Sequence, residues 1–65
     1  MNKLEELRKK KGFTQKEMAE KLGIARSTYS GYEKGYFFPP ITIAIKIKEI
    51  LKYKKDDIFL VINDR

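Results

Sequence analysis

The sequence predicts an all-α fold, a compact bundle of four to five short helices, and three observations lead to this prediction. Glycines divide the 65-residue chain into segments of helical length, at Gly12, Gly23 and Gly35. Thr14 and Glu17 have the T-x-x-E spacing of a capping box, which marks the start of a helix. Apolar residues with the i, i+4, i+7, i+8 spacing of a helix face follow later, at Ile43, Ile47, Ile50 and Leu51.

The first helix is expected to begin at Asn2 and to end at Gly12. Asn2 can cap the helix, with Glu5 at the position that completes a capping box. Leu4 and Leu7 then fall on one face. Gly12 ends the segment, because glycine adopts the left-handed conformation that closes a helix without strain.

The second helix is expected over residues 14–22. Phe13, just before the cap, and Met18, at the fourth helical position, can form a hydrophobic staple across the first turn. The apolar face of this helix consists of Met18, Ala19 and Leu22. Gly23 ends it.

The third helix, residues 25–34, has two unlike faces. At about 100° of turn per residue, Ala25, Tyr29 and Tyr32 fall on one apolar side. The opposite side is small, polar and basic, and it consists of Arg26, Ser27, Ser30, Gly31 and Lys34. Gly35 ends the helix.

A fourth helix is expected over residues 40–52, after a turn made by the aromatic residues 36–38 and two prolines. Residues 41–48 alternate in a β-branched pattern that would also suit a strand. The helical stripe, and Pro40 in the first turn, favour a helix. A final short turn is expected from Asp56 as its cap, Ile58 and Phe59. The apolar tail, residues 59–62, allows a short C-terminal strand.

Composition and charge limit the classes of function. A net charge of +6 on so small a chain favours a polyanionic partner. The chain has no Cys and no His, which removes disulfides, Cys-based metal sites and His-based acid–base chemistry. No apolar run approaches the roughly 20 residues of a membrane span, and the N-terminus does not resemble a signal peptide. We therefore expect a single domain, residues 1–65, that is not an enzyme and needs no metal or cofactor.

The second and third helices, with Gly23 between them and a polar face on the third, predict a helix-turn-helix motif. Ala19 is small where the two helices cross closely, Gly23 makes the turn, and Tyr29 points back into the core. The packing is completed by Leu22, Ile24 and Tyr32. This geometry leaves the first turn of the third helix free to enter a major groove about 12 Å wide.

The motif resembles the helix-turn-helix of the Cro/C1-type (XRE-like) family of bacterial and phage regulators. The resemblance is carried by residues 14–35, TQKEMAEKLGIARSTYSGYEKG, and extends from LRKKKG (residues 7–12) to DDIF (residues 56–59). It implies a lambda repressor-like DNA-binding domain. Two positions depart from the family pattern. Ala25 stands where the family has a Ser or Thr cap, and Lys48 replaces a small apolar residue.

The resemblance also implies roles for individual residues. Base contacts are implied for Arg26, Ser27, Ser30 and Gly31. Phosphate contacts are implied for Gln15, Thr28 and Lys34. Because Gly31 has no side chain, its backbone is expected to approach the DNA closely. Arg8 and Glu33 are expected to form a partly buried salt bridge that ties the first helix to the third.

The expected function is sequence-specific binding of double-stranded DNA by a transcriptional regulator, a repressor, located in the cytoplasm on the nucleoid of a bacterium or phage host. One helix reads only a few base pairs, so a homodimer on a (pseudo)palindromic operator is expected. No separate dimerisation domain is evident. The candidate interface is the fourth helix with Ile58, Phe59, Leu60, Val61 and Ile62. No membrane partner or small-molecule effector is expected.

A second interpretation stays open from the sequence. The chain could be an antitoxin-like or phage-type regulator whose main role is to bind a partner protein. The apolar tail and the aromatic turn at residues 36–38 favour this alternative.

Overall fold

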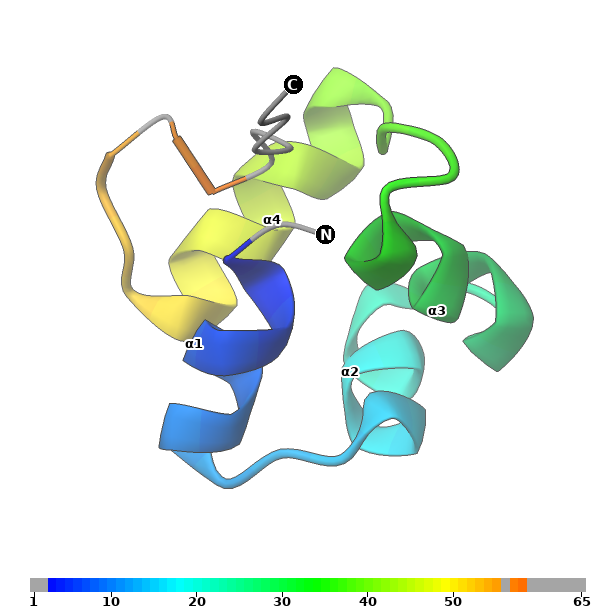
Figure 1. The fold of residues 1–65 in the computed structure, drawn as a ribbon, viewed down its shortest axis with the longest axis horizontal. Coiled ribbons are helices and arrows are strands. Elements are labelled where there is room, and N and C mark those ends of the chain that lie inside the picture. The colour runs from blue at the N-terminus through cyan, green and yellow to red at the C-terminus, as the bar shows by residue number, and fades with distance from the viewer. Residues whose placement is uncertain (1–2, 56, 59–65) are drawn as a thin grey trace, which may run out of the picture.

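The fold consists of four helices in the part of the chain that the computed structural model describes, residues 3–55 and 57–58 (Figure 1). They are α1 (Leu4–Lys11), α2 (Gln15–Leu22), α3 (Arg26–Lys34) and α4 (Ile41–Leu51). The all-α prediction is confirmed, and the alternating segment at residues 41–48 is helical. The predicted roles of Asp56 and of the tail, residues 59–62, lie outside the described residues.

The start of α1 differs from the prediction. Its N-cap is Lys3 rather than Asn2, and the Lys3 side chain makes no capping hydrogen bond. Instead, the backbone N–H of Lys3 donates to the carbonyl of Ile58 at 3.2 Å. The Lys3 ammonium also lies 3.2 Å from the Asp57 carboxylate. The beginning of α1 is therefore fixed by a segment far away in the sequence, which a local capping pattern cannot reveal.

The start of α2 is as predicted. The backbone N–H of Glu17 donates to the Thr14 hydroxyl at 3.0 Å, and the backbone N–H of Thr14 donates to the Glu17 carboxylate at 2.8 Å. This reciprocal capping box satisfies two backbone donors that a helix start leaves unpaired. Glycines in the left-handed conformation follow α1, α2 and α3, at Gly12, Gly23 and Gly35.

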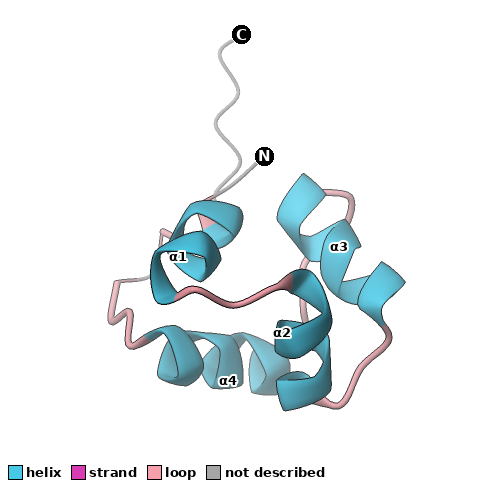
Figure 2. Cartoon of the chain, turned by 90° about the horizontal axis from the view of Figure 1, so that it is seen from below, coloured by secondary structure: helices cyan, strands magenta, loops and turns pink. Residues whose placement is uncertain are grey.

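A single hydrophobic core joins the four helices. Figure 2 shows α3 at one edge of the bundle, with α2 beside it and α4 along the far side of α2. The buried apolar side chains are Leu4, Met18, Ala19, Leu22, Tyr29, Tyr32, Ile47, Leu51 and Ile58. Those packed against them and partly buried are Leu7, Phe13, Ile24, Ile43, Ile50 and Tyr53. The predicted faces of α2 and α4 are thus the faces that the core covers.

The expectation that the Ile58 side chain contributes to a dimer interface is wrong. Ile58 is fully buried in the hydrophobic core. The Ile58 carbonyl accepts a hydrogen bond from the Lys3 backbone N–H, so this residue connects the segment after α4 to the start of α1. Residues 59–62 of the predicted interface lie outside the described residues, and α4 is the part of it that the structure describes. None of the four described helices is long and apolar enough to cross a membrane.

Candidate nucleic-acid interface

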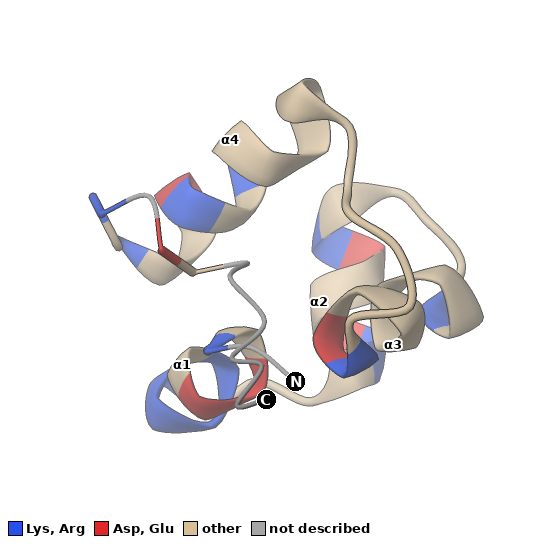
Figure 3. Cartoon of the chain, turned by 45° about the horizontal axis from the view of Figure 1, so that its top comes forward, with Lys and Arg blue, Asp and Glu red and all other residues tan. Residues whose placement is uncertain are grey.

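The helix α3 presents one face to the core and another to solvent. Tyr29 and Tyr32 are buried. On the other side, Arg26 and Ser27 are exposed and Ser30 is half-buried. Figure 3 shows Lys or Arg at both ends of α3. A polar and basic surface on a helix at the edge of the bundle is the arrangement that major-groove reading requires.

The other residues of α3 and its flanks divide between these two faces. Lys34 is exposed at the C-terminal end, and Thr28 is half-buried. Ala25, predicted on the apolar side, is instead the exposed N-cap residue in extended conformation, and no side chain caps α3. An alanine cannot fill that role, because it has no oxygen to accept a backbone N–H.

The turn before α3 brings α2 and α3 together as the motif requires. Gly23 is left-handed with φ 71°, and the N–H of Ile24 donates to the carbonyl of Ala19 at 3.0 Å. Ala19 and Leu22 are buried beneath this turn, and Ile24 packs against the core. The small, buried Ala19 side chain leaves room for α3 to pack against α2.

Arg8 of α1 and Glu33 of α3 form a buried salt bridge. Arg8 Nε donates to Glu33 Oε2 at 2.6 Å, and an Nη group donates to Oε1 at 3.3 Å. The second Nη group donates to the carbonyl of Phe13 at 2.8 Å. Hydrogen bonds from both sides therefore satisfy a pair that would be costly to bury alone.

The amide of Gln15 joins this network. Gln15 Nε2 donates to Glu33 Oε1 at 2.8 Å, so Glu33 accepts hydrogen bonds from both α1 and α2. Burial by itself would raise the pKa of the Glu33 carboxyl. The hydrogen bonds, led by that from Arg8, outweigh this effect and hold the pKa below its usual value. The bond to Glu33 in turn raises the pKa of Arg8.

Burial also raises the pKa of Tyr29, which lies beside Glu33 and Arg8. The Tyr29 hydroxyl is buried and makes no well-formed hydrogen bond within the described part of the chain. Tyr29 is therefore a neutral core residue, and it does not belong to the polar face of α3.

Gly31 is buried, which contradicts the expectation that its backbone is exposed and approaches the DNA closely. The ring of Phe37, from the loop after α3, covers it: a Cβ placed on Gly31 would lie 2.3 Å from the ring tip. The N–H of Tyr36 donates to the carbonyl of Gly31 at 3.0 Å, which closes the C-terminal end of α3 just before Phe37. Sequence reasoning missed Phe37. The available signal was an aromatic run directly after a helix with a glycine in its last two turns.

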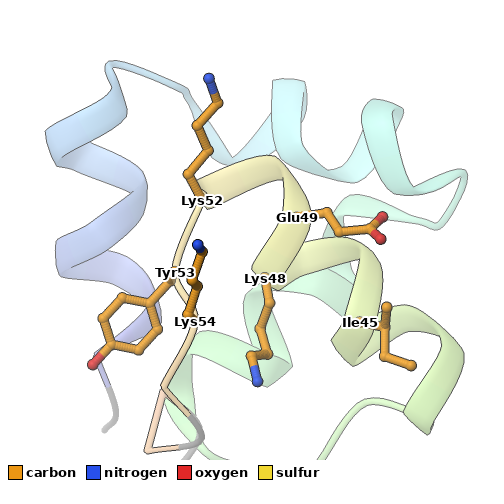
Figure 4. A pocket seen from close by; sticks show the side chains of 6 residues that line it. All are labelled: Ile45, Lys48, Glu49, Lys52, Tyr53 and Lys54. Carbon is orange, nitrogen blue, oxygen red and sulfur yellow. The ribbon is translucent and has the colours of Figure 1, made fainter.

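An open hollow of about 540 Å³ lies on α4 and the segment after it. Figure 4 shows the side chains that line it, Ile45, Lys48, Glu49, Lys52, Tyr53 and Lys54. None of these residues belongs to α2 or α3. The hollow is therefore separate from the polar face of α3. No group of three or more acidic, His or Cys side chains that could hold a metal ion occurs within residues 3–55 and 57–58.

Comparisons with known proteins agree with this geometry. The helix-turn-helix family model matches residues 4–58. The regulator YgzD of Bacillus subtilis, an HTH-type transcriptional regulator, is 36% identical over 58 residues, which cover 89% of this chain and 88% of YgzD. An HTH-type transcriptional regulator of Methanocaldococcus jannaschii is 38% identical over 63 residues, covering 97% of this chain and 96% of that protein. AnsR of Bacillus subtilis is 38% identical over 58 residues, half of its own length. No solved structure matches significantly.

Proposed function

The chain belongs to the Cro/C1-type helix-turn-helix family of DNA-binding transcriptional regulators, and we propose that it represses transcription as a homodimer on a (pseudo)palindromic operator. The observation that supports this proposal is the two-sidedness of α3. Tyr29 and Tyr32 anchor the helix in the core, while Arg26 and Ser27 are exposed. This role would place the protein in the cytoplasm, on nucleoid DNA.

Arg26 is the principal base reader in this proposal. It stands at the first position of α3 and is exposed. Its planar guanidinium can donate two parallel hydrogen bonds to O6 and N7 of guanine. Ser30 lies one turn after Arg26 on the helix surface, and Ser27 is the next exposed residue along the chain. In the proposed complex both reach neighbouring base edges.

Three further residues contact phosphates in the proposed complex, and they set the position of α3 on the duplex: Gln15, Thr28 and Lys34. Gln15 is the first residue of α2, where backbone N–H groups can also donate to a phosphate. One hydrogen of its amide is donated to Glu33, and the second remains for a phosphate oxygen. Lys34 carries its charge at the exposed end of α3.

The dimer contact in this proposal uses the exposed apolar residues of α4. Ile41 and Ile45 are 74% and 50% exposed. Isoleucines on one helix can pack against the same residues of a second copy, as two-fold symmetry requires. Two copies would place two α3 helices on half-sites about one DNA turn, roughly 34–36 Å, apart.

Selection of binding sites from random DNA by the full chain, followed by footprinting, tests this function. We expect a two-fold symmetric site, and binding that weakens steeply with salt as counterions leave several phosphates. Sedimentation of the free protein and of Ile41→Glu/Ile45→Glu, with the exposed Thr42→Glu as the matched control, tests the interface. A strictly monomeric protein that covers a single half-site would exclude the dimer.

A second candidate function, binding of a partner protein, is favoured by the aromatic residues of the loop between α3 and α4. Tyr36 and Phe38 are 72% and 69% exposed, which is unusual for large apolar side chains. A Tyr36→Ser/Phe38→Ser variant distinguishes the two functions. Repression of a reporter placed behind the selected operator should be unchanged if DNA binding is the main role. It should fall without loss of operator affinity in vitro if a partner is required.

A further inference from the structure

The ring of Phe37 lies where a side chain at position 31 would otherwise lie, and position 31 is a glycine. An ideal Cβ on Gly31 would lie 2.3, 2.7 and 3.0 Å from the ring atoms Cζ, Cε2 and Cε1 of Phe37. The far end of the ring therefore fills the space that any larger residue at position 31 would take. The Phe37 ring can pack in this place only because residue 31 of α3 has no side chain.

Two contacts hold the ring in this position. The rings of Phe37 and Tyr32 meet edge to face, with centroids 5.6 Å apart and planes at 87°. Tyr32 is itself buried in the core. The N–H of Tyr36 donates to the Gly31 carbonyl, a bond that closes the C-terminal end of α3 directly before Phe37. Phe37 thus has a fixed orientation relative to α3, although it comes from the loop.

The position of the ring places it beside the polar face of α3. Gly31 lies one turn after Ser27 and Thr28 and one turn before Lys34, so the ring that covers Gly31 lies next to these three side chains on the helix surface. Phe37 itself remains 50% exposed. If α3 enters the major groove with Ser27 facing the bases, the exposed part of this ring faces the edges of base pairs further along the groove.

We propose, on the basis of the proposed function, that Phe37 acts in place of a residue-31 side chain as a specificity-determining residue that selects thymine. Thymine carries the only apolar group on the major-groove edges, its C5 methyl, and aromatic side chains can contact it. Phe37 has no hydrogen-bonding group and can distinguish bases only through such a contact. The adjoining aromatics, Tyr36 and Phe38, are more exposed and belong to the surface considered above for a protein partner.

Replacement of single thymines by deoxyuridine in the selected operator tests this inference, because it removes the C5 methyl and nothing else. Burial of one methyl group is worth about fourfold in affinity, so the full-length protein should bind about fourfold more weakly when one particular thymine is replaced. Phe37→Ala should bind the thymine and uracil operators equally. Phe38→Ala, the matched control, should keep the wild-type pattern.

A second variant covers the case in which Phe37→Ala does not fold, as judged by circular dichroism. Phe37→Gln keeps a long side chain over Gly31 and should also lose the thymine preference at that position. The inference is overturned if no thymine replacement weakens the wild-type protein, or if the folded variant keeps the wild-type sensitivity. Failure of the proposed function would be distinct, since no operator would then be selected at all.

Discussion

Arg8 and Glu33 lie 25 residues apart in the chain, and the Nε of one is 2.6 Å from the Oε2 of the other, with both side chains almost fully buried. The pair joins α1 to α3 on the side of α3 that faces the bundle. Burying two charges is costly unless each keeps its partner. The stability of the domain should therefore respond very differently to the loss of one partner and to the loss of both.

Replacement of one partner, in Arg8→Met or Glu33→Met, should lower the free energy of unfolding by about 3–5 kcal/mol, because a buried charge remains unpaired. The double variant Arg8→Met/Glu33→Met should recover at least about 2 kcal/mol of that loss. Urea unfolding of the four proteins in a double-mutant cycle measures this coupling. Additive losses would show that the pair does not act as a unit.

The lowered pKa of Glu33 predicts acid sensitivity. A carboxyl whose pKa is lower in the folded state than its unfolded value of 4.5 stabilises the fold above pH 4.5. That stabilisation is lost as the pH falls through the lowered pKa. Unfolding free energies measured between pH 6 and pH 2 should therefore decline in the wild type, by a smaller amount in Arg8→Met/Glu33→Met. The hydrogen bond from Tyr53 also lowers the pKa of Asp57, so Asp57 contributes to acid sensitivity in the same direction. The variant Asp57→Asn is therefore the control that separates the contribution of Asp57 from that of Glu33.

Arg26→Ala should weaken binding to the selected operator by about 1–3 kcal/mol and relax the preference at one base pair. Because Arg26 is exposed, the thermal stability of the variant should stay at the wild-type value. Binding-site selection with the variant measures the preference directly. Unchanged selectivity at every position would show that Arg26 is not a base reader.

Gln15→Ala should weaken binding to the operator and to unrelated DNA by similar factors, because a phosphate contact carries no sequence information. Its amide also donates to Glu33, so a loss of stability of about 1 kcal/mol is expected. Affinities are therefore to be compared at a temperature where the wild type and the variant are both folded. A loss confined to the operator would contradict the phosphate assignment.

Gly31→Ala should displace the ring of Phe37, since the new methyl group would lie 2.3 Å from it. Alanine is better than glycine inside a helix by about 1 kcal/mol, so the displacement and the helix preference oppose each other. In a Phe37→Ala background only the helix preference remains, and Gly31→Ala should then stabilise the fold by about 1 kcal/mol. Equal effects in the two backgrounds would show that the ring does not restrict position 31.

The parts of the fold that sequence predicts well are those fixed by neighbouring residues. The capping box of Thr14 and Glu17 and the glycines after three helices act within a few residues, and each lies where the pattern placed it. The stripe on α4 is also recognisable, because its i, i+4, i+7, i+8 spacing favours a helix over a strand with one buried face. These features need no knowledge of the rest of the chain.

The predictions that were wrong depend on distant contacts. The start of α1 is set by Ile58, and the burial of Ile58 depends on how the segment after α4 returns to α1. An apolar residue near the chain end gives no local sign of whether it faces its own core or a second copy. The covering of Gly31 likewise depends on how the loop after α3 places the Phe37 ring against a residue six positions earlier in the chain.

The carboxylate of Glu33 accepts hydrogen bonds from α1 through Arg8 and from α2 through Gln15. Three helices are thereby locked around one side chain before any ligand arrives. A DNA-binding surface that is already ordered loses little conformational entropy when it binds, so more of the contact energy remains as affinity. Association should then proceed as the docking of a rigid body, at a rate governed by charge attraction rather than by folding upon binding.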